Sequence, residues 1–392
     1  MSVARGYQQF AGRWQEHARL AWDTIAMKPT RGIATGGLNV MDWGLLEEIS
    51  GHKPGSYPKD PSRVYLDFQR AIGATMIDQW IPDNPLSMTA EGYASGTPRN
   101  ATTGVERIVR DGMVIDSPEA VVAHMEKFLF PQLVAWGQEL DAKADERVAS
   151  LIEKEVKVQR LFGMNMLKGP YDGFQYFPGF HYGTYGYENY FAAYALYPEV
   201  MEHCFKLQGD VGEKINAGAA SGIVEAGLPG LLRLDHDMAG SRGLLVNVKS
   251  LDRIWLPHFA RAIKPLQDAG VRLIWHCDGN LMDLVPRLLK VGVGGFQGFQ
   301  YEDGMDYERI CRMKTRDGAP LFIVAGVSVT RTLPHGTVAD VRKELRWLVE
   351  QGPRVGLFLG ASSSVAPGTR RRNVKALIEG LRYYREHGRQ GL

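Results

Sequence analysis

Short apolar runs that end in polar residues or glycine alternate with longer amphipathic stretches along most of the chain. The short runs predict buried β-strands, and the long stretches predict helices with one apolar face. Strands are expected at residues 74–81, 231–237, 271–278, 293–300, 321–327 and 355–362. Helices are expected at 117–140, 142–158, 198–227, 250–269, 281–291, 306–315, 337–351 and 370–387. This alternation predicts an α/β fold of parallel strands joined by right-handed crossovers.

Polar side chains gather where the predicted strands end. The residues concerned are Asp235, His236, Asp237, His276, Asp278, Gln300, Glu302, Ser328 and Ser362 to Ser364. No GxGxxG or GxxxxGK[ST] loop follows an early strand, so an open nucleotide-binding sheet is not favoured. In a (β/α)8 barrel these strand ends converge on one face, where the active site lies. We therefore predict a single (β/α)8 TIM barrel.

The predicted barrel spans residues 71–392, and residues 1–70 form an N-terminal helical extension packed on it. Residues 84–116, rich in Gly, Thr and Arg, read as a variable insertion, and 171–191 as an inserted aromatic-rich segment. No internal repeat, low-complexity tract or Pro/Ser-rich linker divides the chain. One domain is the simplest interpretation.

Composition narrows the class of protein. A net charge of +2, from 46 basic and 44 acidic residues, lacks the basic excess of nucleic-acid-binding proteins. Three cysteines without a CxxC pair fit a reducing interior, so a cytoplasmic location is expected. Residues 1–30 contain no continuous apolar stretch of a signal peptide, and no later window approaches the ~20 apolar residues of a membrane span. No nucleic-acid or membrane partner is expected.

The stretch LIWHCDGN, residues 273–280, contains the first candidate site. His276 and Asp278 are two residues apart on a strand end, so both side chains face the same side. Asp235 and Asp237 form a second such pair. If these carboxylates meet, a proton or a cation must offset their repulsion. We predict His276, Asp278 and Asp237 as catalytic residues; a satisfied strand end, an acid–base pair and a metal site all remain open.

Further candidates lie in loops. Glu302, in the YEDG turn, can supply an oxygen ligand or an acid. The run YDGFQYFPGFHYGTYGYENYF is too aromatic to be buried within one regular element. It predicts a structural cluster of rings, a wall for a flat aromatic substrate, or a docking face for a partner protein. The predicted substrate contacts are His181, Tyr182, Tyr185, Arg242 and Ser363.

Four segments carry a resemblance to a known family: DHDMAGSRGLLVNVKSLDRIWLPHFARAIKPLQDAG, LIWHCDGNLMDLVPRLLKVGVGGFQGFQYEDGMD, AGVSVTRTLPHGTVADVRKEL and FLGASSSVAPGTRRRNVKALIEGLRYY. In these segments the chain resembles the uroporphyrinogen decarboxylase superfamily, whose members include cobalamin-dependent methyltransferases. The likeness covers residues 60–385 and keeps the family's order.

Two departures from the family define the expected branch. True uroporphyrinogen decarboxylases carry an Arg-Gln-Ala-Gly-Arg-Tyr type motif, which the region IAMKPTRGIATGG lacks, so porphyrin decarboxylation is not expected. The thiol-directed zinc methyltransferases have His-x-Cys in the 273–280 turn and a further Cys near the last strand. Here Asp278 and Ser363 stand in those places. Carboxylates make a harder site than thiolates, which disfavours a thiol acceptor.

The resemblance implies a corrinoid-dependent methyltransferase that performs O-demethylation of a small methoxy donor, aromatic or aliphatic. His276, Asp278 and Glu302 are the implied ligands of a zinc-like ion that polarises the leaving oxygen; a hydrogen-bonded acid is the alternative. The chain contains no corrinoid-binding Asp-x-His-x-x-Gly segment, so the cobalamin is expected on a partner corrinoid protein or free in solution. The superfamily commonly forms homodimers. Alternative functions are a metal-independent decarboxylase (a carboxy-lyase) and a non-catalytic corrinoid- or tetrapyrrole-binding barrel.

Overall fold

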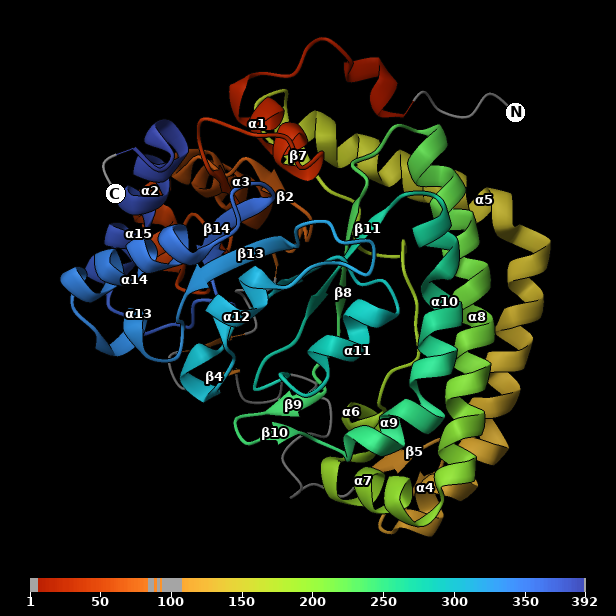
Figure 1. Ribbon diagram of the computed structural model, residues 1–392. Helices are drawn as coiled ribbons and strands as arrows, with labels where there is room; N and C mark the ends of the chain where they lie inside the picture. Colours follow the sequence, from red (N-terminus) through yellow and green to blue (C-terminus); the bar gives the residue numbers. More distant parts are fainter. Residues whose placement is uncertain (1–5, 84–87, 90–91, 94–107, 391–392) are drawn as a thin grey trace.

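A six-stranded parallel sheet lies at the centre of the computed structural model (Figure 1). The structure describes residues 6–83, 88–89, 92–93 and 108–390, so most of the predicted insertion at 84–116 lies outside the described residues. The strand order is β1-β14-β13-β12-β11-β8. Their bounds are β1 (Ala34–Thr35), β8 (Leu231–Asp235), β11 (Arg272–His276), β12 (Gly295–Gln297), β13 (Phe322–Val327) and β14 (Leu357–Ala361).

Two more parallel strands extend this arrangement beyond β1. Strands β2 (Met76–Ile77) and β7 (Leu167–Lys168) pair with each other, and a parallel bridge between Gly36 and Met76 joins them to the end of β1. No backbone ladder joins β7 to β8 in the part of the chain that the structure describes. The fold is therefore α/β and TIM-like, but strand pairing does not show a closed barrel.

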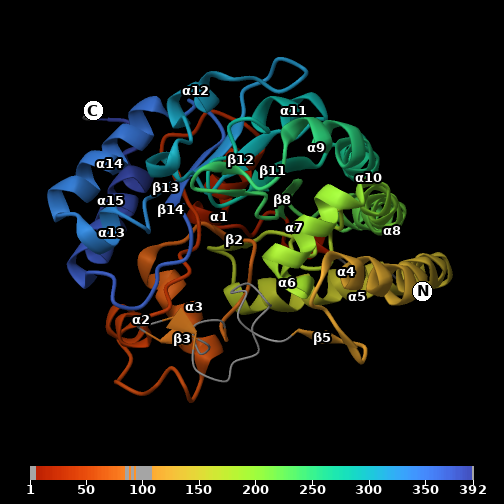
Figure 2. The same cartoon turned by 90° about the horizontal axis from the view of Figure 1, so that it is seen from below.

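Helices surround the strands, as the view from below shows (Figure 2). Helix α8 (Pro198–Glu225) packs between α5 (Phe130–Phe162) and α10 (Leu256–Asp268), and α14 (Val338–Gln351) packs on α15 (Arg371–His387). The others are α1 (Glu16–Ile25), α2 (Trp43–Ser50), α3 (Pro61–Ile72), α4 (Pro118–His124), α6 (Tyr182–Tyr185), α7 (Tyr187–Leu196), α9 (Val248–Ile254), α11 (Val285–Lys290), α12 (Tyr307–Arg312) and α13 (Thr332–His335).

Three antiparallel hairpins complete the described structure. They are β3 (Met88–Thr89) with β4 (Gly92–Tyr93), β5 (Val109–Arg110) with β6 (Met113–Val114), and β9 (Ala239–Gly240) with β10 (Gly243–Leu244). Only the last follows a strand of the central sheet directly, because it continues from the end of β8. Its position places it beside the candidate site described below.

The predicted alternation of strands and helices in the second half of the chain is confirmed. Helix α14 illustrates why, because its limits are encoded locally: Thr337 and Asp340 form a capping box, with Asp340 N donating to Thr337 Oγ1 at 3.2 Å. Its buried residues Val341, Leu345 and Leu348 repeat at helical spacing. The predicted helices 117–140 and 142–158 need correction. There the structure has α4, a π-helical turn and one long α5 with a kink at Lys143.

The N-terminal segment is not purely helical. Helices α1, α2 and α3 occupy most of it, but β1 lies between them and pairs with β14, with Ala34 opposite Phe358. The predicted boundary at residue 70 therefore cuts off a strand of the sheet, although the domain division itself stays a prediction. None of the helices in the described part of the chain combines the length and the hydropathy that a membrane span requires.

Candidate functional site

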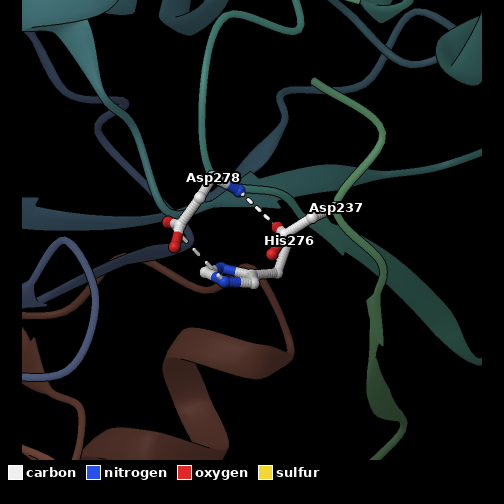
Figure 3. A group of neighbouring side chains, drawn as sticks. All are labelled: Asp237, His276 and Asp278. Carbon is white, nitrogen blue, oxygen red and sulfur yellow. Dashed lines mark hydrogen bonds and ion pairs between the residues drawn. The ribbon is translucent and has the colours of Figure 1, made fainter. Parts of the chain in front are cut away.

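Asp237, His276 and Asp278 meet where β8 and β11 end (Figure 3). The two strands pair in parallel with His276 directly opposite Asp235, so the residues that follow each strand emerge side by side. One atom capable of metal ligation from each of the three residues lies within 4.8 Å of the others. The predicted catalytic residues are therefore brought together, and their catalytic role remains a prediction.

Hydrogen bonds hold the two strand ends in this arrangement. The backbone N–H of Asp278 donates to Asp237 Oδ1 at 2.8 Å, and the hydroxyl of Tyr182 donates to the Asp237 carbonyl at 3.1 Å. The His276 ring lies between carboxylates, with Nε2 4.0 Å from Asp278 Oδ1 and 4.0 Å from Asp235 Oδ1. The imidazole therefore lies within reach of carboxylates from both strand ends.

In the trio formed by Asp237, His276 and Asp278, the two carboxyl groups resist ionisation. Burial raises the pKa of Asp237 and of Asp278, and in each case a neighbouring carboxylate adds to the effect, Asp235 for the first and Asp237 for the second. The charge of His276 acts in the opposite direction. A cation bound between them would favour the ionised form of both groups.

The donor set of the trio fits a metal ion. An imidazole and two carboxylates are ligands of zinc and other first-row divalent ions, and three protein ligands leave a position open in a catalytic site. Asp278 Oδ1 is buried and has no hydrogen-bond partner, as expected of an oxygen that coordinates a metal ion when one is bound. Asp237, His276 and Asp278 are thus the residues that could hold such an ion.

Glu302 does not join this group, contrary to the sequence prediction. After β12 the chain forms a short 3-10 turn, Tyr301–Asp303, and this turn faces the end of β13 rather than β11. Glu302 Oε1 accepts hydrogen bonds from Ser328 Oγ, at 2.6 Å, and from Thr330. Asp237 takes the place that the sequence interpretation gave to Glu302.

A cavity of about 190 Å³ lies beside the trio, and His276 is the member that lines it. Its walls are mixed: apolar residues such as Leu38, Met76, Ile77, Leu231, Ile274 and Phe358 line one part, and polar or charged residues such as Asp78, Arg233, Asp235 and Gln297 line the rest. Ser363 also lines the cavity and donates a hydrogen bond to the Asp278 side chain. Ser363 therefore lies where it could contact a bound substrate, and that contact stays a prediction.

Sequence reasoning missed Arg233, whose guanidinium lines the same cavity. Its side chain is 8% exposed and forms ion pairs with Asp78 at 2.8 Å and with Asp235 at 2.7 Å. The ring of Tyr171 lies 4.5 Å from the guanidinium carbon, and its hydroxyl donates to Asp235 at 3.0 Å. The available signal was a charged residue inside the otherwise apolar strand LLRLD.

The aromatic segment forms mainly a structural cluster. Tyr185 is buried and its hydroxyl lies 3.0 Å from His124 Nδ1, while His181 Nε2 contacts Gln208. Burial lowers the pKa of His181 to about 4, so the ring is neutral at pH 7. Neither His181 nor Tyr185 lines the cavity, so the structure does not bring them together with the trio, and their role as substrate contacts stays a prediction.

Tyr182 is the predicted contact in the aromatic segment that comes nearest to the trio. Its ring stacks on His236, with centroids 5.9 Å apart, and on Tyr187, with centroids 4.5 Å apart. It reaches the trio through the backbone of Asp237 and does not line the cavity. Its place supports a role in positioning the strand end.

Arg242 lies at the exposed tip of the β9–β10 hairpin, outside the cavity lining. The hairpin packs on the turn that follows Asp278, where the backbone N–H of Asn280 donates to the Gly240 carbonyl at 2.9 Å. The structure therefore places Arg242 away from this cavity, and its contact with a substrate stays a prediction.

Gly298 sets the position of the His276 ring. A Cβ at this residue would lie 2.4 Å from His276 Nδ1, and its φ of +79° disfavours any other residue. We expect Gly298→Ala to destabilise the protein by about 2–5 kcal/mol, the sum of backbone strain and overpacking. Gly318→Ala is the matched control, because Gly318 has φ +80° and no atom within 4 Å of its Cβ.

Urea unfolding of both variants measures the difference. The control should lose only about 1–2 kcal/mol from the backbone term. Equal losses in the two variants would show that the His276 ring moves away from Gly298 at no cost.

Comparisons with known proteins add a fold relationship. No family model matches the sequence, and no curated protein matches it. Among solved structures, the chain is similar to a methyltransferase from Methanosarcina mazei, with a TM-score of 0.54 and 14% sequence identity. The match covers 94% of this chain and 98% of that chain. Similarity at this identity shows that the two chains share a fold over nearly their whole length.

Proposed function

We propose that this protein is a corrinoid-dependent methyltransferase of the uroporphyrinogen decarboxylase-like branch, with its eight parallel strands in a (β/α)8 barrel. It would move a methyl group from a small methoxy donor to cobalamin or a corrinoid protein. The observation that carries the proposal is the Asp237, His276 and Asp278 trio beside a cavity of mixed apolar and polar walls at the ends of parallel strands. The methyltransferase with the same fold supports it.

The size of the cavity favours a small donor. Its volume of about 190 Å³ is below the roughly 300–1,000 Å³ of pockets for drug-sized ligands. A tetrapyrrole inside it is disfavoured for this reason, which argues against a corrinoid carrier. The methyl acceptor would instead approach the cavity from outside.

The difficult part of the reaction is the departure of the donor oxygen, because its developing negative charge must be stabilised. The C–O bond of the donor breaks, the methyl carbon bonds to the reduced cobalt of the acceptor, and the oxygen leaves with the electron pair and takes a proton. A phenolic oxygen has a pKa of roughly 10, so it needs help from an acid or a Lewis acid. When bound, a zinc-like ion supplies that Lewis acidity.

The protein's own residues would then bind and orient the donor. His276 and the carboxylates of Asp237 and Asp278 hold the ion or, without it, present a proton to the oxygen. The apolar walls around Ile77 and Phe358 exclude water from the methyl group. Ser363, which donates to Asp278, keeps that carboxylate in place.

The test combines the purified protein with reduced cobalamin, or with a reduced corrinoid protein, and a panel of methoxylated and methylated donors. We expect at least one donor to yield methylated corrinoid, seen by absorbance, together with an equal amount of demethylated product, seen by chromatography. Release of carbon dioxide from a carboxylated substrate, with no methyl transfer from any donor, would replace this proposal with the carboxy-lyase alternative.

A further inference from the structure

The cavity beside His276 carries an excess of negative charge. Among the described residues that line it, Arg233 is the only Lys or Arg, and it faces two carboxylates, Asp78 and Asp235. Lys168, the next cation near Asp78, is itself buried in an ion pair with Glu155 at 2.8 Å. Its charge is therefore already balanced within the protein.

The guanidinium of Arg233 has no N–H to offer a ligand. Nε donates to Asp78 at 2.8 Å, and Nη1 donates to Asp235 at 2.7 Å and to Gln297 at 3.4 Å. Nη2 donates to Gln79 at 3.3 Å and to Asp78 at 3.5 Å. A guanidinium has five N–H groups, and five bonds within the protein account for them. Among the residues that the structure describes, a carboxylated donor would thus find a negative cavity lining without a free cation.

The trio behind the cavity does not reverse this balance. Asp237 and Asp278 add two carboxyl groups next to His276 and do not themselves line the cavity. A divalent ion held by the trio would offset only the two negative charges of its own carboxylates. Asp78 and Asp235 together would then still outweigh Arg233.

We propose that the methyl donor is a small molecule with a positively charged ammonium group, and that the cavity rejects carboxylated donors. This inference rests on the proposed methyl transfer and names the class of its donor. An ammonium group near Asp235 relieves the excess charge, and the ring of Tyr65 in the cavity wall offers a further contact for a cation.

Binding of three unreactive probes of similar size tests directly which charge the cavity prefers in a ligand. Benzylamine, benzyl alcohol and benzoate carry a positive, a neutral and a negative group on the same ring, and calorimetry with the full chain needs no methyl acceptor. We expect benzylamine to bind at least about 10-fold more tightly than benzyl alcohol, and benzoate more weakly than the alcohol. Benzoate binding as tightly as benzylamine would overturn the inference, and so would equal binding of the amine and the alcohol.

Variants that change the charge of the cavity lining test whether the preference for a cation arises there. Asp235→Asn should lower the ratio of amine to alcohol affinity, and the isosteric Gln297→Glu should raise it. Asp252→Asn is the matched control, because Asp252 is also paired with an arginine, Arg287, but lies outside the cavity. If Asp235→Asn does not fold, Gln297→Glu decides alone, and an unchanged ratio in it contradicts the inference.

Turnover separates this inference from the proposed function. The donors 3-methoxybenzylamine, 3-methoxybenzyl alcohol and 3-methoxybenzoate carry a positive, a neutral and a negative group at the same position of the methoxylated ring, and the amine should be demethylated with the highest kcat/KM. Demethylation with 3-methoxybenzoate preferred would overturn the inference and leave methyl transfer standing. Tight binding of benzylamine without demethylation of any donor would keep the charge preference and remove the proposed function.

Discussion

Arg233→Met is expected to destabilise the protein by about 3–5 kcal/mol, because it removes the shared cation from two carboxylates and leaves them unpaired in a largely buried site. The Arg233 side chain is 8% exposed, and its ion pairs with Asp78 and Asp235 measure 2.8 Å and 2.7 Å. Methionine keeps most of the volume of the side chain, so the loss reports mainly on charge. Urea unfolding at neutral pH measures it.

The matched control is Arg287→Met. Arg287 also makes two bonds to one carboxylate, at 2.5 Å and 2.8 Å to Asp252, but both side chains are about one-third exposed. An exposed pair contributes about 0–1 kcal/mol, so this variant should lose little. Equal losses in the two variants would contradict the view that the Arg233 charge is essential to the cavity.

The effect of Arg233→Met should also depend on pH. Burial alone would raise the pKa of Asp78, but the charge of Arg233 and its hydrogen bonds outweigh burial and hold this pKa below its usual value. A carboxyl with a lowered pKa stabilises the fold above its unfolded-state pKa of about 3.9, and the contribution disappears as pH falls through the folded-state value. The difference between the wild type and Arg233→Met should therefore be largest at neutral pH and shrink below about pH 4.

The second half of the fold was predictable because its signals are local. Strands such as β13 and β14 are long enough to show continuous apolar runs, and the helices between them carry caps and apolar faces. Strands β1 and β7 have two residues each, which is too short for any periodic pattern. Their existence depends on the neighbours β14 and β2, which the sequence order does not reveal.

The candidate site was predictable only in part, for a similar reason. The spacing of His276 and Asp278 places both on one side of a strand end, which local sequence can show. The choice between Asp237 and Glu302 depends on whether a turn faces β11 or β13, and that path is set by tertiary contacts such as the bond from Ser328 to Glu302. Arg233 and its partner Asp78 are 155 residues apart, so no spacing rule connects them.

In the aromatic segment, residues 171–191, an unusual composition suggested a functional surface as well as a structural cluster. Its rings pack on one another and on neighbouring helices, and the edge-to-face pair of Phe180 and Tyr194, with centroids 5.8 Å apart, is typical. Gly and Pro break the segment into short pieces, which lets many rings enter one cluster. The segment contributes to the site through Tyr171 and Tyr182, which touch Asp235 and Asp237.

His276→Ala is expected to abolish metal binding and to lower methyl transfer by about 10³-fold or more, because it removes the only nitrogen ligand from the trio. Elemental analysis of protein purified without a His tag or added metal should find near-stoichiometric zinc in the wild type and none in His276→Ala or Asp278→Ala. His52→Ala is the matched control, because His52 also pairs with a carboxylate, Asp67 at 3.0 Å, away from the site. It should retain both zinc and activity.

The pH dependence of transfer decides how the trio acts. Burial raises the pKa of Asp237 and Asp278, so protons compete with a bound ion at a higher pH than at an ordinary aspartate. Zinc content and transfer should therefore fall together as pH decreases through these raised values. The opposite slope, in metal-free protein that loses activity as pH rises through the same values, would show that a protonated carboxyl acts as the acid, because ionisation would then remove the proton that the leaving oxygen needs.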